Sequence, residues 1–273
     1  MPVPALLLAL ASAVVHALWN VLLARSRDPR AAAAVALVTA QIVFAPLVWA
    51  TWDVQASVWP FVLASNVLQL AYFLVLVSAY RVAPLSVVYP IARGTAPVLV
   101  LVVGIVLLGH GTSAGQVLGV CLVGAGVLVV RGQRSTDRRG ATLGIAIACI
   151  IAAYTLVDKN GLNHAAAIPY LALTMIAPAV VSIALAVRTQ GRGALRAELH
   201  LATVVAGIAT FGAYALVLLA LERASAASVA AVRELSVVIT ALLARHVLRE
   251  AVGWERLAGA CAVAGGIALL SIT

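Results

Sequence analysis

The stretch SVVYPIARGTAPVLV, residues 86–100, decides the fold of this chain, because it places Arg93 inside an otherwise apolar segment. A second apolar segment, ASVAAVRELSVVITALL, covers residues 227–243 and carries Arg233. A shift of 140 residues aligns the two arginines. A charge at the centre of a bilayer costs about 2.5–3.5 kcal/mol, so such an arginine is rare and its recurrence is informative. The two segments therefore indicate an internal repeat.

The whole chain is far more apolar than a soluble protein. Of its 273 residues, 64% are hydrophobic and 10% are charged, and the mean hydropathy is +1.12. A soluble domain has about 45–50% apolar and about 25% charged residues, so the surplus apolar surface needs lipid as its solvent. The composition predicts an all-α membrane protein with essentially no soluble domain.

Apolar runs separated by charged or turn residues predict ten transmembrane helices. They lie near residues 3–23, 31–50, 59–80, 84–108, 114–131, 140–158, 167–187, 199–221, 225–247 and 253–272. The loops are short, so we expect consecutive helices to be antiparallel neighbours. The longest connections, 131–140 and 188–198, have no room for an extramembrane domain.

Basic residues are concentrated in alternate loops. The net charge is +9, which in a membrane protein reflects basic cytoplasmic loops rather than a nucleic-acid partner. The odd-numbered loops hold Arg25, Arg27, Arg30, Arg81, Arg131, Arg134, Arg138, Arg139, Arg188, Arg192, Arg196, Arg245, Arg249 and Arg256. The even-numbered loops hold only Lys159 and Arg223. The positive-inside rule then predicts cytoplasmic odd loops and both termini outside.

The chain is predicted to consist of two five-span repeats, residues 1–135 and 136–273. Five is an odd number, so the second repeat enters the membrane from the opposite side and the repeat is inverted. A shift of 135 residues aligns ALWNVLLARS (17–26) with AAYTLVDKNG (152–161) and places Trp19 over Tyr154. Inverted repeats are common in secondary transporters, which bind substrate near the midplane between the halves.

Small residues recur in the last span of each half. They suit close helix packing or a homodimer interface, because a missing side chain lets two backbones approach. These residues are Gly119, Gly124, Gly126, Gly259, Gly265 and Gly266.

Arg93 is the first candidate site residue. Pro90 removes a backbone donor, Gly94 is flexible and Pro97 follows one turn later, so we expect a kinked or locally unwound helix that lines a cavity. Arg93 would then bind an anionic group of a substrate, with Tyr89 beside it. The alternative is a structural arginine paired with a carboxylate or a helix C-terminus.

Arg233 and Glu234 are neighbours within the predicted ninth span. Adjacent residues on a helix point about 100° apart, so each is expected to face a different partner. Glu234 could pair with Arg93 or Arg233 across the interface between the repeats. It would then be either a proton-coupling carboxylate or one half of a permanent structural ion pair.

Other polar or aromatic residues inside the predicted spans are further candidates for the substrate site. They are His16, Trp19, Asn20, Asn66, Gln69, Tyr72, Tyr154 and Tyr214. Asn66, Gln69 and Tyr72 follow each other at intervals of three, which predicts a shared helix face and a cavity wall. Asp158 and Lys159 end the predicted sixth span and are expected at the membrane interface.

The sequence offers no convincing catalytic centre. HExxH, Walker A and GxGxxG motifs are absent, and the ionisable residues within spans include no evident nucleophile with a base. Cys121, Cys149 and Cys261 lie in apolar runs without the spacing of metal ligands. We expect no enzyme activity, no cofactor and no metal site.

Taken together, these features resemble the EamA-like branch of the drug/metabolite transporter superfamily. The resemblance covers ten short-looped spans, two repeats, and similar ends of the halves, LLGHGTSAGQVLGVCLVGAG (107–126) and VLREAVGWERLAGACAVAGG (247–266). HALWN (16–20) and VYPIARGTAP (88–97) also resemble blocks of that family. His110 departs from the pattern, because many members have a glutamate at this position of the first half. The second half keeps the glutamate, as Glu250.

The resemblance implies a multi-pass permease of the cytoplasmic membrane that moves small organic metabolites or toxic compounds, often outward and without ATP. Members carry amino acids, drugs, sugars or nucleotide derivatives, so the substrate is not implied. One alternative is a proton-coupled exporter of cationic aromatics that uses Glu234 and would give resistance to cationic dyes. Another is a non-transporting membrane subunit, which would copurify with a partner and give no flux.

Overall fold

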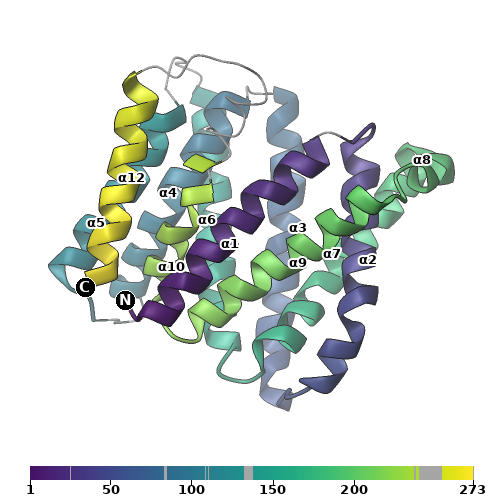
Figure 1. Cartoon of the computed structure of the whole chain (residues 1–273), viewed down its shortest axis with the longest axis horizontal. Coiled ribbons are helices and arrows are strands. Elements are labelled where there is room, and N and C mark those ends of the chain that lie inside the picture. Colours follow the sequence, from purple (N-terminus) through teal and green to yellow (C-terminus); the bar gives the residue numbers. More distant parts are fainter. Residues whose placement is uncertain are drawn as a thin grey trace.

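The computed structural model describes residues 1–24, 26–82, 85–107, 109, 111–131, 138–236, 238–239 and 254–272. Within these ranges the chain is helical apart from loops and one isolated bridge between Val54 and Ala165. The helices are α1 (Val3–Ala24), α2 (Pro29–Ala50), α3 (Trp59–Val82), α4 (Leu85–Val106), α5 (Ala114–Arg131), α6 (Arg138–Gly161), α7 (Ala167–Thr189), α8 (Gly191–Ala197), α9 (Leu201–Leu221), α10 (Ala226–Arg233) and α12 (Trp254–Ile272), with a 3-10 turn, η1 (Ala56–Val58) (Figure 1).

Most predicted spans coincide with a helix to within a few residues. Within the described ranges, stretches long and apolar enough to cross a membrane are Arg30–Ala50, Ala56–Leu76, Arg138–Gly161, Ala167–Thr189 and Leu201–Leu221, and four shorter apolar helices accompany them. Of the ninth predicted span, 225–247, α10 covers the first part, while residues 237 and 240–253 lie outside the described ranges. The count of ten helices therefore stays a prediction.

One connection differs from the expectation. Residues 188–198 were predicted as a plain loop, but the structure forms the short helix α8 there. Gly191 has a φ of 82°, a left-handed conformation that favours glycine, and the chain changes direction at this residue after α7. Helix α8 projects beyond the ends of its neighbours (Figure 1).

Helices α5 and α12 pack against each other through glycines from both halves. A Cβ on Gly119 would lie 3.1 Å from the carbonyl oxygen of Gly266, and one on Gly126 would lie 2.7 Å from that of Gly259. Because the lower number on α5 meets the higher number on α12, the two helices run antiparallel. The glycines thus serve packing within the chain, as small residues do between membrane helices.

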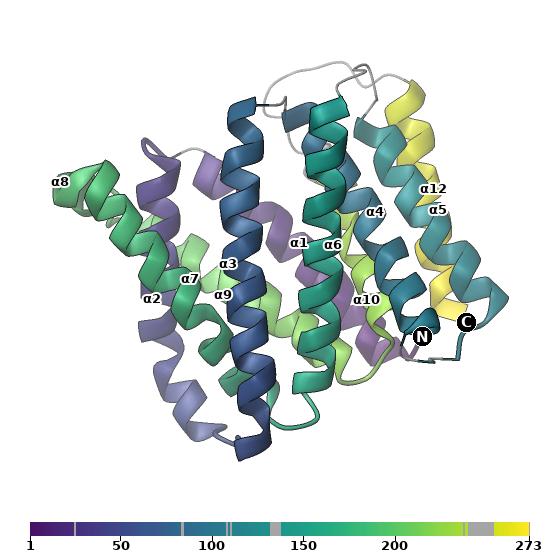
Figure 2. The same cartoon turned by 180° about the vertical axis from the view of Figure 1, so that it is seen from behind.

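The helix contacts keep the same pattern when each helix is replaced by its counterpart in the other half. Helix α1 packs on α9 as α6 packs on α3, and α2 packs on α9 as α7 packs on α3. Helix α4 packs on α6 as α10 packs on α1, while α2–α7 and α5–α12 are pairs between equivalent helices. Helices α1 and α9 form one side of the molecule (Figure 1), and α3 and α6 form the opposite side (Figure 2). This is the pattern expected of an inverted repeat.

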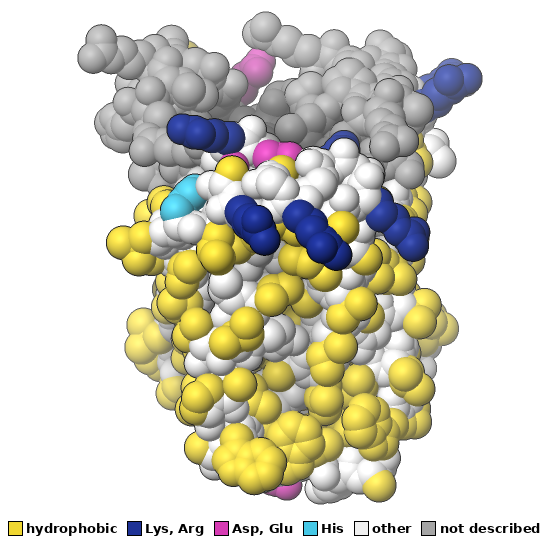
Figure 3. All heavy atoms as spheres, turned by 90° about the vertical axis from the view of Figure 1, so that its right-hand side faces the viewer, with side chains coloured by type: hydrophobic (Ala, Val, Ile, Leu, Met, Phe, Trp, Pro, Cys, Tyr) yellow, Lys and Arg dark blue, Asp and Glu magenta, His cyan; other side chains and the backbone are white. Residues whose placement is uncertain are grey.

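The two ends of the helical body differ in chemistry. Arg27, Arg138, Arg188 and Arg196 belong to the end that carries α8, and Figure 3 shows basic side chains gathered there above an apolar surface. The chain termini lie together at the opposite end, where the Met1 amino group donates to the carbonyl oxygen of Leu270 at 3.1 Å. We call these the basic end and the terminal end.

Three exposed tryptophans lie near the terminal end. Trp49 is 83% exposed, and Trp52 and Trp59 are also exposed, all close to the connection between α2 and α3. Tryptophan favours the interface between lipid and water. The terminal end therefore has the character of a membrane interface.

Candidate functional site

A cavity of about 420 Å³ lies between the two halves. Residues of α1, α2, α3, α4, α6, α7, α9 and α10 line it, so nearly every packed element contributes to its wall. The predicted site residues among them are His16, Trp19, Gln69, Tyr72, Arg93, Tyr154, Tyr214 and Arg233. The rest of the wall is largely apolar, with Met175 and Phe211 as its large members.

Arg93 of α4 holds together helices from both halves. It is 9% exposed, and its Nη1 donates to Oε1 of Glu234 at 3.4 Å. Its Nη2 lies 3.4 Å from Nε2 of His16 on α1. A guanidinium can only donate, so this ring nitrogen acts as the acceptor. An ion pair thus joins the halves beside the cavity, as the second of the two sequence interpretations of Arg93 expected.

Helix α4 is not unwound at the predicted place. We expected a kink or local unwinding around Pro90, Gly94 and Pro97, and of these the unwinding is wrong, because α4 is continuous from Leu85 to Val106. A Cβ on Gly94 would lie 2.9 Å from the carbonyl oxygen of Gly124, so this glycine permits close packing of α4 on α5 rather than flexibility.

In the equivalent span of the second half, α10 ends at Arg233. Glu234 caps it, with its N–H bonded to the carbonyl oxygen of Ala231 at 3.0 Å. Glu234, which is 4% exposed, contacts Arg93, while Arg233 lines the cavity. The two neighbours therefore face different partners, as their helical spacing predicts.

Arg233 lies against an aromatic ring. Its guanidinium carbon is 5.5 Å from the centroid of the Tyr214 ring on α9, a cation–π arrangement. Among the described residues, no carboxylate lies within 4.0 Å of Arg233. The charge of Arg233 is thus presented at the cavity wall without an ion-pair partner in the described part of the chain.

Aromatic side chains from both halves form part of the wall. Trp19 and Tyr154, which the shift of 135 residues aligns, both line the cavity. The Tyr154 ring makes an edge contact with Tyr72 at 6.4 Å, and Trp19 makes one with His16 at 4.9 Å. The Trp19 indole N–H is buried and has no hydrogen-bond partner among the described residues.

The predicted polar face of α3 divides between two roles. Gln69 and Tyr72 line the cavity, but Asn66 does not. The Asn66 amide donates to the carbonyl oxygen of Leu173 at 3.1 Å and accepts from the N–H of Ala177 at 3.2 Å, just before Pro178 in α7. Residues three apart on a helix point about 60° away from each other. Asn66 and Tyr72, six residues apart, therefore cannot both face the same cavity squarely.

Asp158, which the sequence predicts at the membrane interface, is enclosed by other helices. Helix α6 continues to Gly161, and Asp158 is 0% exposed. Its Oδ1 accepts from the Tyr170 hydroxyl at 2.9 Å and its Oδ2 accepts from the Tyr214 hydroxyl at 2.5 Å. The position of Asp158 four residues after Tyr154, on the same helix face, was the available signal.

Some sequence candidates fall outside the described part of the chain. The side chains of Asn20, Tyr89 and Pro90 are among them, as are residues His110 and Glu250.

The GTSAG stretch at 111–115 has the G-x-S-x-G spacing of some hydrolases. Ser113 Oγ there accepts the N–H of Gln116 at 3.1 Å, at the start of α5. This is the position and contact of a helix cap.

Two loops pair with each other beyond the cavity at the terminal end. Tyr154 lines the cavity, Asp158 lies one turn further along α6, and the loops beyond it pair through Ala166 N–H to Asp53 O and Gln55 N–H to His164 O, both at 2.9 Å. Toward the basic end, the lining continues to Leu23 and Ser182, near the ends of α1 and α7.

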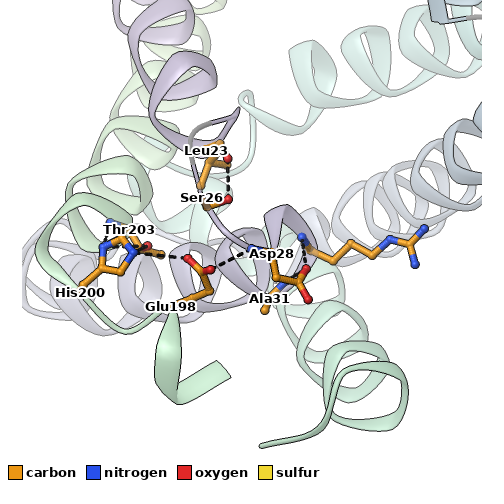
Figure 4. Close-up of polar contacts among 8 residues, drawn as sticks. Leu23, Ser26, Asp28, Ala31, Glu198, His200 and Thr203 are labelled. Atoms are coloured by element: carbon orange, nitrogen blue, oxygen red, sulfur yellow. Dashed lines mark hydrogen bonds and ion pairs between the residues drawn. The ribbon is translucent and has the colours of Figure 1, made fainter. Parts of the chain in front are cut away.

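At the basic end, a separate contact fixes α2 beside α9. The N–H of Asp28 donates to Oε1 of Glu198 at 2.9 Å, and Nε2 of His200 lies 3.4 Å from the other carboxylate oxygen (Figure 4). Glu198 is 1% exposed. Helices α2 and α9 pack on each other, so this contact holds neighbours in place rather than closing the cavity.

Comparisons with known proteins agree with this architecture. A solved structure titled only as the crystal structure of a protein is similar in fold, with a TM-score of 0.76 and 18% sequence identity over 98% of this chain and 97% of that chain. No curated protein matches the sequence. The model of the EamA-like transporter family matches twice, over residues 3–132 and 138–272, which correspond to the two repeats. The chain belongs to the EamA-like transporter family, within the drug/metabolite transporters.

Proposed function

We propose that the chain is a secondary transporter of small organic metabolites that works by alternating access, with the cavity beside Arg93 and Arg233 as its substrate site. Family membership makes it a membrane transporter of the drug/metabolite type. The position of the cavity between two halves whose helix contacts follow the same pattern supports alternating access, because such halves have two related arrangements around one central site.

The chemistry of the wall favours a substrate with an anionic group and an apolar or aromatic body. Arg233 presents its charge at the cavity and has no carboxylate within 4.0 Å among the described residues, and this observation carries the proposal. The Trp19 indole N–H adds a donor, and Tyr72, Tyr154 and Phe211 provide rings for the body. Carboxylates, phosphonates and phosphates are the head groups that guanidinium recognises best.

The geometry also favours one access direction. The cavity lining extends toward the basic end, while paired loops cover the terminal end. The positive-inside rule places the basic end in the cytoplasm. We therefore propose that this conformation faces the cytoplasm and that both termini lie outside. A reporter fused to either terminus would give its external signal under this topology, and a cytoplasmic signal would contradict it.

The alternative of an exporter of cationic aromatics has weaker support. It requires Glu234 to bind the cation, but that carboxylate lies 3.4 Å from Arg93. An arginine in this position competes with a substrate cation for the carboxylate, and its positive charge repels that cation.

The proposal is tested by ligand binding followed by flux. Purified protein is screened by thermal shift against carboxylates, phosphonates, phosphates and organic cations, since a ligand that binds the folded state raises Tm. Compounds that raise Tm are then tested for counterflow in proteoliposomes. We expect stabilisation and counterflow for anionic compounds. Stabilisation by cations alone would support the alternative, and binding without flux for every compound would indicate a non-transporting subunit.

A further inference from the structure

Asp158 is a buried carboxylate for which the substrate site proposed above has no use. It lies on α6 one turn beyond Tyr154, between the cavity and the paired loops of the terminal end, and it is 0% exposed. Any ion that passes between the cavity and the terminal end must cross this level of the molecule. The position is therefore suited to a coupling site.

The groups around Asp158 are mostly neutral hydroxyls from different helices. Tyr170 of α7 donates to one carboxylate oxygen and Tyr214 of α9 donates to the other, at 2.9 and 2.5 Å. The Ser65 hydroxyl of α3 is a third hydrogen-bond partner, and it also accepts from Gln69 at 2.9 Å. A carboxylate so enclosed keeps hydrogen bonds to both of its oxygens.

In the described part of the chain, the charged and titratable groups near Asp158 do not form an ion pair with it. Arg233 of α10 interacts with it electrostatically across Tyr214. Lys159, its neighbour on α6, donates instead to the carbonyl oxygen of Leu221, and Arg93 of α4 pairs with Glu234. Tyr154 is the other titratable side chain on this part of α6.

Asp158 has hydroxyl neighbours and Glu234 has an arginine neighbour, and this difference makes Asp158 the better candidate for a proton carrier. An arginine in contact, as beside Glu234, stabilises the charged carboxylate, and removal of that charge would leave a buried cation unpaired. Hydroxyls can serve both forms: they donate to a carboxylate, and a serine hydroxyl can also accept from a carboxylic acid. The enclosure of Asp158 thus tolerates gain and loss of a proton.

We propose that Asp158 is the proton-binding site of the transporter and that Tyr214 connects it to the substrate cavity. One proton adds to the carboxylate and no other bond changes. Neutral Asp158 no longer offsets the charge of Arg233, so an anionic substrate binds better to the protonated protein. By reciprocity the substrate favours proton binding equally, which couples the two in the same direction. This coupling rests on the proposed function, whereas proton binding by Asp158 can be measured without any substrate.

The test is infrared difference spectroscopy of the purified full-length protein in lipid bilayers between alkaline and mildly acidic pH. A carboxylic acid has a C=O stretch above the amide bands that a carboxylate lacks. We expect an acid band in the wild type that persists in Glu234→Gln and is lost in Asp158→Asn. Absence of a band from the wild type, or its full retention in Asp158→Asn, would overturn the proposal.

A second variant keeps the test decisive if Asp158→Asn does not fold. Tyr214→Phe removes one donor to the carboxyl group and retains the ring beneath Arg233. The acid band should then shift to higher frequency, because its carbonyl loses a hydrogen bond, while Tyr72→Phe should leave it in place. An unshifted band in Tyr214→Phe would contradict the assignment. Because no substrate is present, failure of the transport assay does not affect this result.

Discussion

The Arg93 guanidinium lies 3.4 Å from the Glu234 carboxylate, and this ion pair connects the first half of the chain with the second. Both side chains are buried, 11% and 5% exposed. Removal of one partner from such a pair leaves a buried charge without compensation. Loss of either partner should therefore lower the stability of the protein and also disturb the cavity that Arg93 lines.

We predict that Arg93→Met and Glu234→Leu each lower the stability of the protein by about 3–5 kcal/mol, whereas the double variant loses much less. The reason is that each single variant leaves one charge buried alone. Thermal unfolding in lipid or detergent, arranged as a double-mutant cycle, measures the coupling. Additive losses in the double variant would show that the two side chains do not interact.

The glycine contacts between α5 and α12 give a prediction with a matched control. In Gly126→Ala, the new Cβ would lie 2.7 Å from the carbonyl oxygen of Gly259, so the helices must separate. Such overpacking costs about 1–3 kcal/mol. In Gly265→Ala, the nearest atom is a Leu122 methyl at 3.6 Å, an ordinary contact. Thermal unfolding should show a lower Tm for the first variant only, and equal Tm values would contradict the packing.

Trp19 should contribute a hydrogen bond to an anionic ligand. Trp19→Phe keeps a ring at the cavity wall but removes the buried indole N–H, which has no partner among the described residues. A hydrogen bond to a charged group contributes about 1.5–3 kcal/mol, so ligand affinity should fall by roughly ten- to a hundredfold. Trp59→Phe, at an exposed position on α3, is the control. Isothermal titration with an anionic compound from the screen measures both, and equal affinities would exclude this role for Trp19.

Helix positions and several residues that line the cavity could be predicted from the sequence because their signals are local. Runs of apolar residues are enough to place helices such as α5 and α7. Arg93 and Arg233 could be identified because a charge in an apolar run is costly wherever the helix packs. Trp19 and Tyr154 could be paired because the repeat relates them.

The rest depends on tertiary contacts that a single sequence does not contain. From the sequence, Asp158 is a charged residue near the end of an apolar run. Only the folded structure brings Tyr170 and Tyr214 from other helices into contact with it. Asn66 shares its spacing with Gln69, but only the position of α7 decides that it bonds to that backbone. The prolines around Gly94 suggested a kink or unwinding in α4, yet α4 is continuous and Gly94 packs closely on α5.

The central claim, that Arg233 binds the anionic group of a transported substrate, is tested most directly by counterflow in proteoliposomes with an anionic compound from the screen. Arg233→Ala is compared with Arg223→Ala, an exposed arginine paired with Glu222. We predict wild-type flux for Arg223→Ala and, for Arg233→Ala, a loss of about tenfold or more at subsaturating substrate, with unchanged insertion in the membrane. Wild-type flux in Arg233→Ala would contradict the account.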